Sequence, residues 1–401
     1  MLYLYDDARA RTFEPFALTR PISELRAGAE LIRRRWEHVT GKRATGFLGA
    51  PHIADFEEPD SPPSVPPHTT IPAGSIIVNA RCVVALSERL DLTHQFWSCE
   101  NRVAAVRLQE SIAAAAFADG TLSLDTLSAA GSAWRLHGRW LLDVWDLIAQ
   151  LPSQLTDDIA ALIPSIGATS LLHDGLGPMP AVVEEGATIE PYVLFDTQGG
   201  PILIRRGATI CAFTRISGPC YIGEGAVIVG DRVANCSIGE LSKIRGEISS
   251  SVVLGHSNKG HTGFVGHSYV GRWVNLGAGT TTSNLKNTYG TIQLWTPSGL
   301  RDTQQQFLGT MFGDHVKTGI GTMLTTGTVV GCGANVYGSS ASPKYVAPFS
   351  WGDGEPYDTF AVEKFLSVAG RMMQRRHVTL SDRQRRHLAR VHALARNTLP
   401  R

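Results

Sequence analysis

The stretch from Lys259 to Gly290, KGHTGFVGHSYVGRWVNLGAGTTTSNLKNTYG, is the part of the sequence richest in side chains that can do chemistry. Its polar candidates are His261, His267, Asn275, Asn284 and Lys286. Transfer of an acetyl group from a thioester to an amine needs a base that takes the amine proton and donors that hold the oxyanion. A histidine with a near-neutral pKa and an asparagine amide suit these two roles. The segment therefore predicts an acyl-transfer site.

The elements around this segment follow a six-residue period, which is neither helical nor a simple alternation. Apolar or small residues recur at Val183, Ile189 and Phe195, at Ile204, Ile210, Ile216, Ile222 and Ile228, at Phe264, Val270 and Leu276, and at Ile320, Thr326 and Cys332. Repetition at a fixed period indicates a solenoid. Three such hexapeptides per coil give a triangular prism with the periodic residue inside. The alternative, an antiparallel β-sandwich, would show turn signals every ~8 to 12 residues.

The N-terminal half has the pattern of a small α/β domain. A short apolar strand at Leu2–Tyr5 precedes a helix whose apolar positions include Leu25, Ala29, Ile32 and Trp36, and the β-branched run Gly74–Leu86 predicts a buried strand. Helix-prone segments follow at Glu110–Phe117 and Trp140–Gln150.

The tail from Tyr357 onward predicts two helices with a basic face. We interpret them as a cap over the open end of the prism rather than as a site for RNA or phosphate. The predicted domains are thus an α/β domain at 1–165, an all-β left-handed parallel β-helix at 180–345 and a helical tail at 356–401.

Composition points to small-molecule partners. The 37 basic and 36 acidic residues give a net charge of +1, so no overall field attracts nucleic acid or anionic lipid. No apolar run reaches the ~18 residues of a membrane span, and the six cysteines lack CxxC spacing. We therefore expect a cytoplasmic protein with buried thiols.

The segment from Gly260 to Asn284 resembles the GH…YxG…VNxGAGTxTxN block of the bifunctional UDP-N-acetylglucosamine pyrophosphorylase/glucosamine-1-phosphate N-acetyltransferases (GlmU type) and of related archaeal sugar-1-phosphate nucleotidylyltransferases. The resemblance implies that His261 is the general base and that Asn284 positions the amine or stabilises the transition state. It also implies acetyl-CoA held between the subunits of a homotrimer. Two positions depart from the family pattern, because Phe264 replaces a tyrosine and Lys286 is not at the usual spacing.

Further site residues are expected on the same basis. Substrate binding is expected at Lys286, Asn275, Lys243, Arg245, Arg20 and Arg26, and acetyl-CoA binding at Lys317, Thr318, Gly319 and Thr326. No protein-bound metal is expected unless the nucleotidyl step, which needs Mg²⁺, survives.

The segment PFALTRPISELRAGAELI resembles the one that follows the nucleotide-binding loop of sugar nucleotidyltransferases. The preceding DDARARTFE has no glycine to cradle a triphosphate, and Ile22 and Ser23 stand where the family has a lysine. Asn79, Ala80 and Arg81 stand where an aspartate should bind Mg²⁺. These departures predict a reduced nucleotidyltransferase-like domain that either binds sugar nucleotide differently or no longer catalyses, and we favour the second alternative.

The leading hypothesis is an acetyl-CoA-dependent N-acetyltransferase of an amino-sugar phosphate or amino-sugar nucleotide. One alternative is a bifunctional enzyme that also forms the sugar nucleotide, with Arg20, Arg26 and Arg81 on phosphates. A second is a zinc site built from His256, His261 and His267 across a subunit interface. A third is a non-catalytic trimeric scaffold that binds sugar nucleotide.

Overall fold

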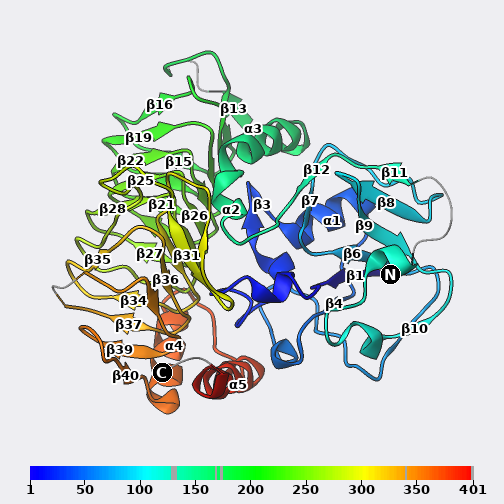
Figure 1. Cartoon of the computed structure of the whole chain (residues 1–401). Coiled ribbons are helices and arrows are strands. Elements are labelled where there is room, and N and C mark those ends of the chain that lie inside the picture. The colour runs from blue at the N-terminus through cyan, green and yellow to red at the C-terminus, as the bar shows by residue number, and fades with distance from the viewer. Residues whose placement is uncertain (128–132, 168, 172–174, 339–340, 399–401) are drawn as a thin grey trace. The chain divides into compact units, whose positions relative to one another are not determined.

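The computed structural model describes residues 1–127, 133–167, 169–171, 175–338 and 341–398, and the chain divides into two compact units (Figure 1). Met1–Val144 and Ser381–Val391 form the first unit, and Trp145–Leu380 and the residues from His392 onward form the second. Residues 128–132, 339–340 and 399–401 of the predicted domains lie outside the described residues.

The first unit is built on a six-stranded sheet in the order β11-β8-β9-β6-β1-β4. Its strands are β1 (Leu2–Tyr5), β4 (Gly46–Leu48), β6 (Ile76–Asn79), β8 (Phe96–Cys99), β9 (Arg102–Arg107) and β11 (Trp134–Arg135). Strand β1 is parallel to both β4 and β6, and all four of its residues are buried. The predicted strand at Leu2–Tyr5 is confirmed, whereas the run Gly74–Leu86 forms two buried strands, β6 and β7 (Cys82–Val84), instead of one. The carboxyl ends of β1 and β6 meet at one edge of the sheet.

The helices of this half differ from those predicted. Helix α1 covers Ile32–Thr40 only, because Gly28, at φ 66°, turns the preceding chain into a hairpin of β2 (Arg26–Ala27) and β3 (Glu30–Leu31). The predicted helix at Glu110–Phe117 is wrong, since that segment forms β10 (Ile112–Ala113) and a 3₁₀ turn. The predicted helix at Trp140–Gln150 shrinks to α2 (Asp146–Ala149), and α3 (Leu151–Leu162) follows with Pro152 in its first turn, where proline is tolerated.

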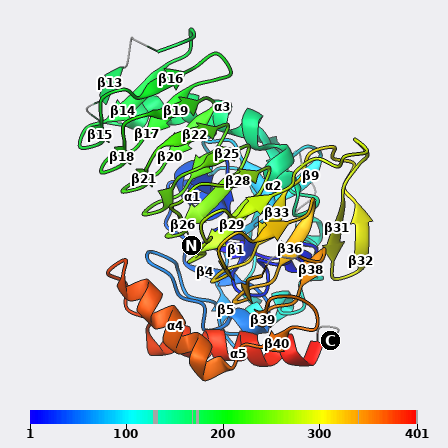
Figure 2. The ribbon, with the colours of Figure 1, turned by 90° about the vertical axis from the view of Figure 1, so that its left-hand side faces the viewer.

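The second unit is a parallel β-helix, which confirms the predicted fold class (Figure 2). One face holds β13 (Thr169–Leu171), β14 (Ala181–Glu184), β17 (Ile202–Ile204), β20 (Cys220–Ile222), β23 (Ser237–Ile238), β26 (Val252–Gly255), β29 (Tyr269–Arg272), β33 (Thr310–Phe312), β36 (Thr328–Val330) and β38 (Tyr345–Val346). The second face holds β15 (Thr188–Ile189), β18 (Thr209–Ile210), β21 (Val227–Ile228), β24 (Lys243–Ile244), β27 (Asn258–Lys259), β34 (Lys317–Thr318), β37 (Asn335–Val336) and β39 (Ser350–Gly352). The third holds β16 (Leu194–Asp196), β19 (Thr214–Ser217), β22 (Asp231–Ala234), β25 (Glu247–Ser249), β28 (Phe264–Gly266), β30 (Thr281–Thr282) and β35 (Met323–Leu324).

The register explains the six-residue period through Ile228, whereas the predicted inward place of Phe264 and Ile320 is wrong. Val265 instead of Phe264 pairs with the inward Ile248, and Ile320 is 82% exposed. Ile204 pairs with Ile222 and Ile210 with Ile228, each eighteen positions further along, so three periods close one coil. These isoleucines are fully buried and stack in one continuous core. A hairpin of β31 (Gln293–Thr296) and β32 (Gly299–Asp302) interrupts the coils after the polar segment.

One corner of the prism is a column of residues with left-handed backbone. Their φ angles lie between 54° and 88°, and they are Gly186, Gly207, Gly225, Leu241, His256, Trp273, His315, Gly333 and Phe349. Where the column is aromatic, the rings contact one another, with 4.5 Å between the centroids of His256 and Trp273.

The two predicted tail helices are confirmed as α4 (Val362–Gln374) and α5 (Asp382–Thr398). Phe365 of α4 packs edge-on against His315 and Phe349, with centroid distances of 5.7 and 5.0 Å. Helix α4 therefore lies against this corner. Among the described residues, no helix has the length and apolarity required to cross a bilayer.

Candidate functional site

A two-residue bulge exposes His261 at a corner of the prism. Ile244 pairs with Lys259, and Glu247 pairs with Phe264. The chain therefore advances three positions between these pairs in one coil and five positions in the next. The extra residues leave the ladder at the corner between β27 and β28, and His261 is exposed there. The predicted base is thus accessible to a substrate.

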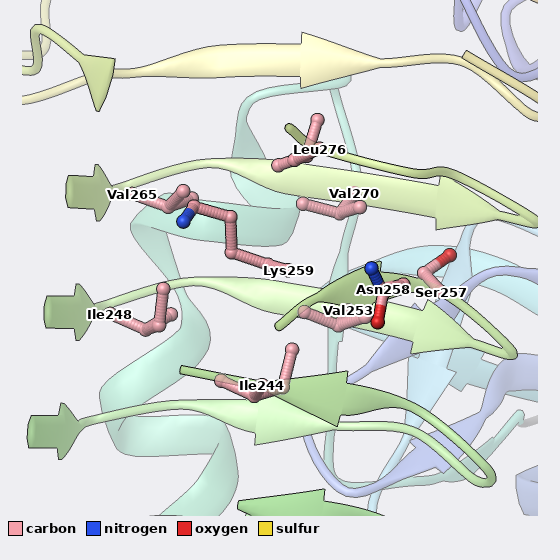
Figure 3. A pocket seen from close by; sticks show the side chains of 9 residues that line it. All are labelled: Ile244, Ile248, Val253, Ser257, Asn258, Lys259, Val265, Val270 and Leu276. Carbon is pink, nitrogen blue, oxygen red and sulfur yellow. The ribbon is translucent and has the colours of Figure 1, made fainter. Parts of the chain in front are cut away.

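Lys259 holds this bulge from inside the prism. It occupies an inward position that neighbouring coils fill with aliphatic residues, and its exposure is 3%. Its Nζ donates to the carbonyl oxygens of His261 and Thr262, the latter at 2.7 Å. Figure 3 shows the side chain among Ile244, Ile248, Val253, Val265, Val270 and Leu276. Burial lowers the pKa of Lys259 to about 8.

Asn284 is paired with His267 rather than with His261. Its Nδ2 lies 2.8 Å from Nδ1 of His267, whose ring stacks on Phe307 at a centroid distance of 5.2 Å. Burial lowers the pKa of His267, which favours the neutral ring that can accept this hydrogen bond. A Cβ at Gly266 would lie 2.4 Å from Phe264 and 2.6 Å from the Asn284 amide, so only glycine fits between them.

Sequence reasoning named His267 as a polar candidate but did not predict that it pairs with Asn284. A left-handed φ of 46° puts His267 at the corner that follows β28, whereas His261 lies at the corner that precedes it. Within one chain, the two predicted catalytic residues therefore stand at different corners. His256 lies at the third corner of the same coil, so the three histidines of the zinc hypothesis do not converge in one chain.

Three predicted ligand-binding residues fall on one outward column. Lys243 pairs with Asn258, Asn258 bridges to Asn275, and Asn275 bridges to Lys317. The side chains of Asn258 and Asn275 are joined by a hydrogen bond of 2.9 Å from Nδ2 to Oδ1. Parallel register thus aligns polar residues that are far apart in the sequence.

The residues expected to bind acetyl-CoA are not equally accessible. Lys317 donates to the carbonyl oxygen of His315 at 3.1 Å, and burial lowers the pKa of Lys317 to about 8. Thr318 is buried, and its hydroxyl lies 2.7 Å from that of Thr280. It therefore holds adjacent coils together rather than facing a ligand.

Gly319 and Thr326 also have local partners. A Cβ at Gly319 would lie 2.6 Å from Cβ of Tyr337, so the glycine allows close approach of the next coil. Thr326 is buried, and its hydroxyl accepts a hydrogen bond from Nζ of Lys344 at 3.1 Å.

Two further predicted substrate residues lie at the surface of the β-helix. Lys286 donates to the carbonyl oxygen of Thr291, and Arg245 lies 3.4 Å from a carboxylate oxygen of Asp231. Arg245 is exposed, so this weak pairing leaves it accessible.

Arg20 and Arg26, by contrast, belong to the core of the first unit. Arg20 is buried and forms an ion pair of 2.8 Å with Glu58, and Arg26 is buried and donates to the carbonyl oxygen of Ala29. An exposed phosphate would have to displace these partners, so the geometry gives their predicted substrate role no support.

The first unit holds a second candidate site, a cavity of about 480 Å³ where β1 and β6 end. Nη2 of Arg81 lies 2.6 Å from a carboxylate oxygen of Asp7, which also accepts a hydrogen bond of 2.8 Å from Asn79. Burial raises the pKa of Asp7, but the hydrogen bonds from Arg81 and Asn79 outweigh it and lower the pKa overall. The guanidinium groups of Arg81 and Arg102 both lie over the ring of Trp140.

The fold and these two sites define a chain with an α/β pocket domain followed by a β-helix that carries a polar coil. Residues 2–165 match the family model described as sugar nucleotidyl transferase. This match ends beyond the boundary of the compact units at Val144, so the predicted domain bounds stay predictions.

Curated relatives agree with the resemblance seen in the sequence. The chain is 32% identical over 151 residues to a bifunctional protein GlmU of Jannaschia sp. (strain CCS1), covering 36% of this chain and 31% of that protein. It is 31% identical over 91 residues to a bifunctional sugar-1-phosphate nucleotidylyltransferase/acetyltransferase of Sulfurisphaera tokodaii, covering 23% of each. The predicted resemblance to GlmU-type proteins is confirmed, over a third or less of the length of these two relatives.

Among solved structures, the N-acyltransferase AntD of Bacillus cereus, in complex with an amino-sugar nucleotide and coenzyme A, covers 45% of this chain and 78% of its own at 12% identity and a TM-score of 0.19. The UDP-N-acetylglucosamine acyltransferase of Campylobacter jejuni covers 55% and 95% at 13% identity and a TM-score of 0.16. Similarities with such low TM-scores carry no argument about function.

Proposed function

We propose that this chain is a transferase of sugar-nucleotide biosynthesis that moves an acetyl group from acetyl-CoA to the amine of an amino-sugar phosphate or amino-sugar nucleotide in the cytoplasm. The observation that carries the proposal is the bulge at His261. A buried ammonium is costly in an aliphatic core, and here Lys259 occupies one to satisfy the carbonyl groups of that bulge. The coil thus departs from its repeat where an exposed imidazole is presented.

In the proposed reaction, the amine nitrogen attacks the thioester carbonyl carbon while His261 takes the amine proton. The C–N bond forms, the C–S bond breaks, and the CoA thiolate leaves and is protonated. Asn284 orients the amine or the developing oxyanion through its amide, which the bond to His267 holds in place.

A homotrimer is part of this proposal. Because His261 and Asn284 stand at different corners of one prism, a site that contains both requires corners of neighbouring chains to meet. Of the residues expected to bind acetyl-CoA, Thr318 and Thr326 are buried against their own coils. Lys317 is the residue of this set that can offer a positive charge to the ligand.

The test is a thiol-release assay with acetyl-CoA and a panel of glucosamine-1-phosphate and amino-sugar nucleotides. We expect free CoA with one acceptor and loss of most turnover in His261→Ala. His68→Ala, which changes an exposed histidine of the first unit, is the matched control. Full turnover in His261→Ala would remove the proposed base, and silence across the panel would remove acetyl transfer.

The cavity of the first unit favours a second candidate function, the binding of a sugar nucleotide without the nucleotidyl step. Its volume lies within the ~300 to 1,000 Å³ of small-molecule sites, at the strand ends where α/β sheets bind ligands. Mg²⁺ does not fit well beside Asp7, because Arg81 and Asn79 already occupy that carboxylate. Calorimetry with UTP and UDP-sugars should show binding, and a mixture of UTP, sugar-1-phosphate and Mg²⁺ should release no pyrophosphate. Pyrophosphate formation in that mixture would instead establish a bifunctional enzyme.

A further inference from the structure

A small cavity of about 70 Å³ lies between the outward polar column of the β-helix and the end of α4. Its lining residues are His256, Asn258, Val274, Asn275, Met372, Arg375 and Arg376. None of these residues is acidic, and two are arginines. The cavity therefore has an excess of positive charge.

The arginines have no counter-charge that explains them. In the described part of the chain, neither Arg375 nor Arg376 forms an ion pair with a carboxylate, and Nε of Arg376 is buried without a hydrogen-bond partner. Burial and the nearby charge of Arg375 lower the pKa of Arg376. Cations stabilise a helix C-terminus, which accounts for basic residues after Gln374. That effect does not account for a buried guanidinium nitrogen left without an acceptor.

The amides on the opposite wall add donors. Because Oδ1 of Asn275 accepts the hydrogen bond from Asn258, Nδ2 of Asn275 is the group that remains for a ligand. Nδ1 of His256 lies 3.2 Å from Nη1 of Arg272, so that ring nitrogen is already occupied by a guanidinium. A ligand in this cavity must therefore supply acceptors and negative charge.

We propose that this cavity binds a phosphate group. The guanidinium fork matches the oxygens of a phosphate, and the cavity is far smaller than the ~300 to 1,000 Å³ of sites that enclose whole ligands. It takes one charged group and leaves the rest of the molecule outside.

The position of the cavity suggests where the phosphate comes from. Asn258 precedes His261 by three residues, so their Cα atoms lie within about 11 Å. The phosphate of an amino-sugar phosphate or a phosphate of coenzyme A can supply the group. The binding itself does not depend on acetyl transfer taking place.

The experiment is calorimetry on the full chain at low salt with inorganic phosphate as the probe. We expect binding that weakens about 10- to 100-fold in Arg376→Gln, because a hydrogen bond to a charged group is lost. Arg375→Gln should weaken it as well, and Asn275→Asp should abolish it by placing a carboxylate in the cavity. Arg371→Gln, an exposed arginine of α4 outside the lining, should leave it unchanged.

Two further arms identify the source of the group. Tighter binding of glucosamine-1-phosphate than of phosphate, with none of glucosamine, names the sugar phosphate. If 3′-dephospho-CoA binds more weakly than CoA, the group in the cavity is the 3′-phosphate of the coenzyme. Equal phosphate affinity in the wild type and all three cavity variants, or no binding of any phosphate-bearing probe, overturns the proposal. Thermal melting confirms that each variant is folded.

Discussion

At the scale of the residue, Lys259 shows how a solenoid can host a site without losing its core. Most inward positions of the coils hold aliphatic residues. By its size alone, a methionine would pack at such a position with little change. Lysine is needed at this position because the bulge turns two carbonyl groups towards the interior. An unpaired buried carbonyl costs about 1 to 3 kcal/mol, so the ammonium offsets part of its own burial.

The folded-state pKa of Lys259, about 8 against an ordinary 10.5, predicts a pH dependence of stability. The folded protein releases this proton at lower pH than the unfolded chain, so the burial penalty is relieved as the pH rises from 8 to 10.5. The free energy of unfolding of the wild type, relative to Lys259→Met, should rise by roughly 1 to 3 kcal/mol between pH 7 and pH 10. Urea unfolding measures it, and parallel pH profiles would contradict the assignment.

The pair of His267 and Asn284 predicts a charge effect. In Asn284→Asp, a carboxylate replaces the amide 2.8 Å from the ring, and the pKa of His267 should rise from below its ordinary 6.5 to above it. A proton NMR titration of the ring measures the shift. Asn287→Asp, on an exposed neighbour, serves as control and should leave the titration unchanged.

At the scale of the element, helix α4 packs through the buried residues Phe365, Leu366, Ala369 and Met373, of which Phe365 contacts the aromatic corner of the β-helix. Phe365 is 1% exposed and contacts Phe349, Phe360 and His315, which extends the aromatic corner into the tail. The arginines that line the small cavity lie directly after this helix or at its end. Packing of the helix thus decides whether that cavity exists.

Phe365→Ala should therefore destabilise the second unit by about 3 to 5 kcal/mol, the usual cost of truncating a buried phenylalanine. It should also weaken phosphate binding, because the arginines that line the cavity follow this helix. The coils far from α4 should stay folded. Chemical unfolding and calorimetry give the two readouts. Ser367→Ala, which alters an exposed residue of the same helix, is expected to do neither.

At the scale of the whole molecule, the proposed acetyl-transfer site depends on assembly. One prism presents His261 and Asn284 at different corners, and a trimer of 43.3 kDa chains has a mass of about 130 kDa. Analytical ultracentrifugation should give this mass, and a stable monomer with full turnover would exclude a shared site.

Mixing variants tests the same point through activity. His261→Ala and Asn284→Ala should each be inactive alone, and co-expression should restore about a quarter of the sites if each site takes one residue from each of two chains. Folded mixed trimers without any recovery would contradict a shared site.

The sequence by itself determined the coil architecture, because burial of one side chain per hexapeptide imposes a period that is visible along the chain. It also located the polar coil and the α/β character of the first half. It misjudged the start of α1, since the hairpin turn at Gly28 depends on neighbouring strands. It also could not show that Arg20 is buried beside Glu58, because that ion pair joins residues far apart in the sequence.

Only the tertiary structure decided which polar residues meet. His267 joins Asn284 through the parallel register of successive coils, and Asn275 shares a cavity with Arg376 because α4 folds back onto the column. The sequence alone gave Lys259 no role, whereas in the structure the bulge beside it turns carbonyl groups inward and its ammonium lies in the core. Such contacts follow from the stacking of coils, and no local spacing encodes them.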